Sequence, residues 1–153
     1  IDNVKDLAPG RLILGLGAGD FTSEHRAYGF DFERHVGRFE DALHILLPLL
    51  RGERFSYAGE FHRVEDAELL PRSGGPMPPV MIRTLRGLPR MSRLTAQHAD
   101  MWNCMIAFGD CALSTFLGAW APIERACEKH GRDPATLKRG ATVSVNFSDG
   151  PYG

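Results

Sequence analysis

Two apolar patterns alternate along the chain. Short apolar runs bounded by glycine, proline or polar residues occur at 11–16, 80–82 and 99–104. Such runs are too short for a helix and predict buried strands. After each of them, apolar residues recur at steps of three and four, which predicts a helix with one buried face. Strands and helices that alternate in this way predict an α/β fold with a parallel sheet.

The helical pattern occurs in three places. The first predicted helix spans roughly Phe32–Arg51. The second begins near Pro89, because proline is favoured in the first turn of a helix. The third is predicted to be capped by Asp110 and to end at His130-Gly131.

Two further elements complete the predicted order. Residues 55–64 are typical of a small β-hairpin, and the alternation in Thr142–Phe147 predicts a fourth strand. The segment 71–79 is rich in proline and glycine, and 83–89 follows a strand, so both are predicted loops. The order is therefore strand, helix, hairpin, strand, helix, strand, helix, strand.

Composition narrows the class of protein. The 153 residues are 43% apolar and carry a net charge of −1, which argues against disorder and against a nucleic-acid or anionic-membrane partner. Cys104, Cys111 and Cys127 show no C-x-x-C spacing, so reduced thiols in a cytoplasm are expected. No apolar run approaches a membrane span, and the first residues do not resemble a signal peptide.

The segment from Gly15 to Asp20 is the first candidate for chemistry. Gly17 and Gly19 follow a strand, where glycine lets backbone amides approach a ligand closely. A dinucleotide fingerprint would need glycine where Asp20 stands, which disfavours a Rossmann site. Two other interpretations stay open, a tight packing turn and a loop that lines a ligand site. The polar groups of such a loop would be Asp20, Ser23, Glu24 and His25.

A cluster of arginines is the second candidate. Arg83, Arg86, Arg90 and Arg93 lie in eleven residues, where a predicted strand passes through a loop into a helix. The N-terminus of a helix favours anions, and guanidinium groups add to that preference, so the cluster predicts a phosphate or carboxylate site. The alternative for Arg90 and Arg93 is a solvated helix face.

The six histidines fit no usual metal pattern, and no metal site is predicted. The chain also lacks a G-x-S-x-G nucleophile elbow. A packing or solvated role is therefore expected for most histidines. His25 is the exception, because it follows the glycine loop. Trp102 and Trp120 are expected in the core.

Several segments, taken in order, resemble the bacterial luciferase-like monooxygenases, whose members use coenzyme F420 (a deazaflavin) or FMN. The resemblance begins at the glycine loop, 10–19, covers nearly the whole chain and is closest to the F420-dependent class. The other matching segments are Glu24–Gly29, Arg38–Leu43, Gly59–His62, Pro78–Ile82, Pro89–Met91, Ala99–Asn103 and Gly131–Pro134.

The resemblance implies a (β/α)8 barrel, of which this chain is a part, with F420 at the carboxyl ends of the strands and FMN as the alternative cofactor. It also implies hydride transfer between a small organic substrate and the ring, or flavin-linked oxygenation. Gly17 and Gly19 would flank the ring, and Ser23 would face the ring or the substrate. Asp20 is the candidate catalytic residue, a polar or proton-handling group on the substrate side.

The cofactor phosphate would be held near the arginine cluster. The resemblance assigns this role to Arg83, Arg86, Gly87 and Arg90. Family members usually carry Ile-Gly-Gly-x-Gly-Pro after the corresponding strand, whereas here Ile82 is followed by Arg83 and the paired glycines are absent. This departure weakens phosphate binding or changes which amides provide it.

A complete barrel takes about 250 residues. The sequence is therefore expected to form one partial domain, 1–153, without about three strand–helix units before it and one after it. The alternative is a non-catalytic half-barrel that binds an anionic ligand weakly or needs a partner chain, because unpaired strand edges favour association. That partner could be a second copy, in a homodimer.

Overall fold

The structure is a computed structural model that describes residues 2–70, 76–84, 88–106 and 113–143. The chain divides into two compact units, 1–80 and 81–153, and each is described by itself. Among the described residues, no helix combines the length and the apolar character that crossing a membrane requires.

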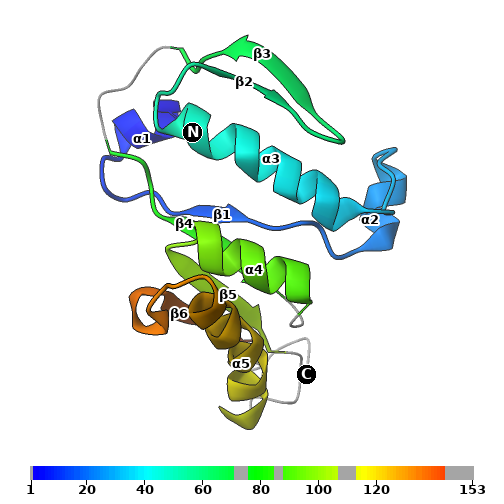
Figure 1. Ribbon diagram of the computed structural model, residues 1–153, viewed down its shortest axis with the longest axis vertical. Helices are drawn as coiled ribbons and strands as arrows, with labels where there is room; N and C mark the ends of the chain where they lie inside the picture. Colours follow the sequence, from blue (N-terminus) through cyan, green and yellow to red (C-terminus); the bar gives the residue numbers. More distant parts are fainter. Residues whose placement is uncertain (1, 71–75, 85–87, 107–112, 144–153) are drawn as a thin grey trace, which may run out of the picture. The chain divides into compact units, whose positions relative to one another are not determined.

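The first unit is built around one long helix. Figure 1 shows α3 with β1 on one side and the β2–β3 hairpin on the other. The N–H of Leu14 donates to the carbonyl of Pro79 at 2.9 Å, so the start of β1 lies beside the residue that precedes β4. The elements are α1 (Asp2–Leu7), β1 (Leu14–Leu16), α2 (Thr22–Ala27), α3 (His35–Leu50), β2 (Phe55–Ala58) and β3 (Arg63–Ala67).

Helix α3 confirms the predicted amphipathic helix. Phe39, Leu43, Leu47 and Leu50 are buried at the predicted steps of four and three, and they form the core of this unit. The helix continues through Pro48. It ends where the backbone N–H of Arg51 donates hydrogen bonds to the carbonyls of Leu47 (3.2 Å) and Pro48 (3.0 Å).

The predicted hairpin is also confirmed. β2 and β3 pair antiparallel, with Phe55 opposite Ala67 and Tyr57 opposite Val64. The register shifts between Phe55 and Tyr57, and Asp66 on the partner strand has a left-handed backbone, with φ of 49°. A bulge of this kind increases the local twist of the hairpin.

The second unit contains strand–helix–strand connections with parallel strands. β4, β5 and β6 run parallel, with Ile82 opposite Trp102 and Trp102 opposite Arg139. Helices α4 and α5 pack against each other (Figure 1). The elements are β4 (Val80–Thr84, whose first residue closes the first unit), α4 (Pro89–His98), β5 (Met101–Met105), α5 (Leu113–Lys129), a 3-10 turn (Pro134–Thr136) and β6 (Lys138–Thr142).

The core of the second unit surrounds Trp102, whose side chain is fully buried, as expected. Its ring lies 5.4 Å from the ring of Trp120, and its Nε1–H donates to Thr84 Oγ1 at 2.7 Å. Arg132 closes the end of α4, because its guanidinium donates to the carbonyls of Ala96 and Ala99 at 2.9 and 2.7 Å. Hydrogen bonds from a cationic side chain satisfy the backbone carbonyls that have no partner at a helix end.

Several predicted boundaries are wrong. The structure has a strand at Lys138–Thr142, which begins four residues before the predicted strand Thr142–Phe147; the residues of that prediction from 144 on lie outside the described part. The segment Lys138–Thr142 is polar and has no apolar alternation from which a strand could be predicted. It becomes a strand because it forms hydrogen bonds with β5. Arg83 belongs to β4 and not to the loop. The segment after Asp20, for which no helix was predicted, contains the short helix α2.

Candidate functional site

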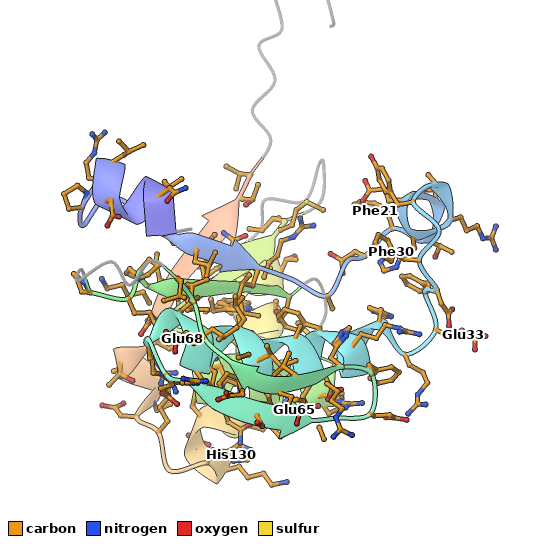
Figure 2. All side chains as sticks on the ribbon, turned by 90° about the horizontal axis from the view of Figure 1, so that it is seen from above. Phe21, Phe30, Glu33, Glu65, Glu68 and His130 are labelled. Atoms are coloured by element: carbon orange, nitrogen blue, oxygen red, sulfur yellow. The ribbon has the colours of Figure 1, made fainter. Side chains whose placement is uncertain are left out.

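A pocket of about 800 Å³ lies in the first unit, beside the loop that follows β1. Its walls come from that loop, from α2 and the segment that joins it to α3, from one face of α3, and from the hairpin turn. Figure 2 shows Phe30 in the segment after α2. The lining residues are Gly17, Ala18, His25, Gly29, Phe30, Asp31, His35, Arg38, Phe39, Ala42 and His62.

Gly17 and Gly19 suit glycine for different local reasons. Gly19 has φ of +81°, a left-handed conformation that favours glycine. A Cβ at Gly19 would lie 2.5 Å from Nε2 of His25, so the backbone also packs closely on that ring. Gly17 has no atom within 4 Å of the place where a Cβ would stand, so it presents open backbone at the pocket wall.

His25 is held by aromatic contacts. Its ring meets the Phe32 ring edge-on at 5.1 Å and the His35 ring at 6.2 Å, and Phe32 and His35 stack at 4.3 Å. Nδ1 of His35 lies 3.0 Å from the carbonyl of Phe32. In contrast, Nδ1 of His25 is buried and has no hydrogen-bond partner among the described residues. A buried polar atom without a partner is unfavourable and is a natural contact for a ligand.

Arg38 provides a second such atom. It lies one turn after His35 on α3, and its Nε is buried without a hydrogen-bond partner in the described part of the chain. The rest of the guanidinium lies over the Phe61 ring at 4.8 Å and forms a 3.6 Å ion pair with Asp31. Both partners of this pair are partly exposed, so it stabilises little. The pocket therefore offers two polar nitrogens, on His25 and Arg38.

Asp41 fixes the hairpin turn that brings His62 to the pocket. Its buried carboxylate accepts hydrogen bonds from the Tyr57 hydroxyl (2.9 Å) and from the N–H groups of Phe61 (2.7 Å) and His62 (3.2 Å). Burial by itself raises the pKa of Asp41, but these hydrogen bonds outweigh it and hold the pKa below its ordinary value of 3.8. Burial and the hydrogen bond to Asp41 raise the pKa of the Tyr57 hydroxyl.

The structure brings only some of the predicted site residues together. Gly17 lines the pocket, and Gly19 packs on His25. Asp20 and Ser23 are exposed and are not among the lining residues. The catalytic role of Asp20 stays a prediction.

The described arginines of the cluster have different neighbours. Arg83 Nη2 lies 3.4 Å from the sulfur of Met105, on the neighbouring strand. Arg90 lies on α4 beside a second pocket, which it shares with residues of α5. Arg86 and Gly87 lie outside the described residues. Their predicted roles at a phosphate are therefore not tested.

Sequence reasoning missed most of the lining residues, among them His35, Arg38 and His62. Two of them carried a signal, because His35 and Arg38 are three apart on one helix and face the same side. Both precede the strongly apolar positions of α3, so a polar end to that face could have been predicted. His62 carried no such signal, since its place depends on the carboxylate of Asp41.

The different roles of Gly17 and Gly19 can be distinguished by substituting each with alanine. We expect Gly19→Ala to lower the free energy of unfolding by about 1–2 kcal/mol, because alanine is strained at positive φ. Gly17→Ala, which fills open space, should leave stability nearly unchanged. Urea titration followed by circular dichroism measures both values. Equal stability of Gly19→Ala and the wild type would contradict the left-handed backbone at Gly19.

Two features define the class of protein. Parallel strands are joined through helices, and a glycine loop at the carboxyl end of a strand borders a pocket. α/β enzymes place their ligands at these strand ends. The chain belongs to the luciferase-like monooxygenase family, whose sequence profile matches residues 3–151.

Curated relatives agree with the family. The chain is 29% identical over 149 residues to an F420-dependent glucose-6-phosphate dehydrogenase of Kineococcus radiotolerans, and the match covers 95% of this chain and 42% of that protein. It is 33% identical over 146 residues to an F420-dependent hydroxymycolic acid dehydrogenase of Mycobacterium tuberculosis, covering 94% and 38%. The chain thus spans less than half the length of these relatives.

Solved structures confirm the predicted fold class. An F420-dependent secondary alcohol dehydrogenase, solved with an F420–acetone adduct, superposes with a TM-score of 0.74 at 18% identity over 90% of this chain and 41% of that one. An F420-dependent tetrahydromethanopterin reductase of Methanopyrus kandleri gives 0.72 at 19% identity, over 88% and 41%. The α/β architecture is therefore part of a barrel fold.

Proposed function

We propose that this chain is part of an F420-dependent oxidoreductase that transfers a hydride between a small organic substrate and the deazaflavin. Family membership and relatives named as F420-dependent enzymes support the proposal. The observation that carries it is the pocket behind the glycine loop, with its two unpartnered nitrogens. FMN is the alternative cofactor.

The residues present fit a flat ring that carries hydrogen-bond acceptors. Gly17 leaves open space at the pocket wall, and Nδ1 of His25 and Nε of Arg38 are buried without partners in the described residues. These two nitrogens would bind ring oxygens or nitrogens, and Gly17 and Gly19 would allow the ring to approach the backbone. When bound, the deazaflavin supplies the hydride acceptor or donor.

Roles at the cofactor or substrate are also proposed for the other residues that the sequence singled out. Asp20 directly follows Gly19, and Ser23 lies in α2. Both would reach the substrate side, with Asp20 as the proton-handling group. The cofactor phosphate would be held by Arg83, Arg86, Gly87 and Arg90. Residues 1–153 would act as one partial barrel domain, in the cytoplasm, with a homodimer as one form of association.

The phosphate role of Arg86 has a direct test. We expect Arg86→Ala to weaken F420 binding about tenfold or more, because guanidinium–phosphate bonds are charge-assisted. Fluorescence titration of the purified protein with F420 gives the dissociation constant. Arg93→Ala is the matched control from the same cluster and should bind F420 like the wild type. Unchanged affinity in Arg86→Ala would remove that residue from the site.

A further inference from the structure

A second pocket, of about 440 Å³, lies between α4 and α5. Its charged lining is entirely cationic among the described residues. Arg90 and Arg93 come from α4, and Arg125 and Lys129 come from α5. His130, labelled in Figure 2, follows α5 and lines the same pocket. We name it the α4–α5 pocket.

Helix geometry gathers these cations on two facing walls. Arg90 and Arg93 are three residues apart, and Arg125 and Lys129 are four apart, so each pair shares one face of its helix. Like charges at this spacing repel each other. Neither Arg125 nor Lys129 makes a hydrogen bond or an ion pair with another described residue. Because the whole chain has a net charge of −1, the α4–α5 pocket is a local concentration of positive charge.

Ser92 gives an independent indication of a ligand. It lines the α4–α5 pocket between the two arginines of α4, and it is only 2% exposed. Its Oγ is buried and has no hydrogen-bond partner among the described residues. A buried hydroxyl of this kind is unfavourable until an acceptor reaches it. An oxyanion oxygen is such an acceptor, and it is also what the surrounding cations favour.

We propose that the α4–α5 pocket binds a small multivalent oxyanion, a molecule with two or more neighbouring phosphate or carboxylate groups. The forked guanidinium group of Arg125 matches such oxygens, and Lys129 adds a point charge. The Ser92 hydroxyl donates to one further oxygen. The volume lies in the range of small-molecule sites, about 300–1,000 Å³. The proposal does not rest on the deazaflavin pocket of the first unit.

Isothermal titration calorimetry with pyrophosphate and with citrate tests the proposal and separates the two ligand classes. At least one of them is expected to bind saturably, and acetate, which carries a single charge, is expected not to. The double variant Arg125→Gln/Lys129→Gln should bind about tenfold more weakly or worse. The matched control Glu124→Gln/Glu128→Gln changes the same helix and the same number of charges outside the pocket lining, and it should bind no more weakly than the wild type.

The melting temperature of Ser92→Ala, measured with and without ligand, distinguishes loss of binding from loss of folding. Without ligand it should melt at a higher temperature than the wild type, because the unsatisfied hydroxyl is gone. With ligand it should gain less in melting temperature. Equal affinity of the double variant and the wild type would overturn the proposal, as would the absence of saturable binding by either anion. A loss of F420 affinity in the double variant would also overturn it, because the pocket would then belong to the cofactor.

Discussion

Trp102→Ala should lower the free energy of unfolding of the second unit by about 3–5 kcal/mol. The side chain is fully buried on the central strand β5. Its ring packs 5.3 Å from Phe116 and 5.4 Å from Trp120, and both contacts disappear with the ring. The substitution also leaves the hydroxyl of Thr84 without its donor. A domain of ordinary stability, about 5–15 kcal/mol, would be left close to unfolding.

Trp102→Phe is the matched control for packing. It keeps an aromatic ring and removes the Nε1–H···Oγ1 bond to Thr84, so a smaller loss, about 1–2 kcal/mol, is expected. Urea titration followed by circular dichroism gives both values, and Trp120 remains as a fluorescent reporter. A loss below about 1 kcal/mol for Trp102→Ala would mean that this ring does not fill the core.

Asp41→Ala is expected to destabilise the first unit by about 3 kcal/mol. Three donors lose their acceptor together, the Tyr57 hydroxyl and the N–H groups of Phe61 and His62. The hairpin would lose its attachment to α3, and His62 its place at the pocket. Asp41→Asn keeps the shape and one acceptor oxygen, so it should cost less. Equal stability of Asp41→Ala and the wild type would contradict this carboxylate network.

The same carboxylate makes stability depend on pH in a defined direction. The folded state holds the pKa of Asp41 below its ordinary value of 3.8, so the stabilisation is fully present above that value. It is lost as the pH falls through the folded pKa, because the unfolded state binds the proton first. Between about pH 5 and pH 3, the wild type should therefore lose more stability than Asp41→Asn. Parallel slopes for the two proteins would show that Asp41 is not the titrating group.

The sequence was sufficient to predict the elements whose apolar pattern is strong. Leu43 and Leu47 mark the buried face of α3, and Trp102 lies in the core as expected. It failed at β6, because Lys138–Thr142 is polar and becomes a strand only through pairing with β5. Local pattern carries no information about such pairing.

The candidate site shows the same difference between what local sequence predicts and what tertiary structure adds. Gly17, Gly19 and His25 were found from the sequence because they are neighbours in the chain and follow a strand. Arg38 and His62 reach the pocket through α3 and through the hairpin bonded to Asp41, which are tertiary arrangements. Arg90 illustrates the opposite case. It belongs to a sequence cluster, yet its side chain lines a pocket with α5.

We propose that the pocket of the first unit binds the deazaflavin. The most direct test of this claim is equilibrium titration of the purified protein with F420 and with FMN, followed by fluorescence. We expect saturable binding of F420, weaker binding of FMN, and loss of F420 affinity in Gly17→Ala, whose methyl group would enter the pocket. Saturable binding of neither cofactor by the folded protein would contradict the claim.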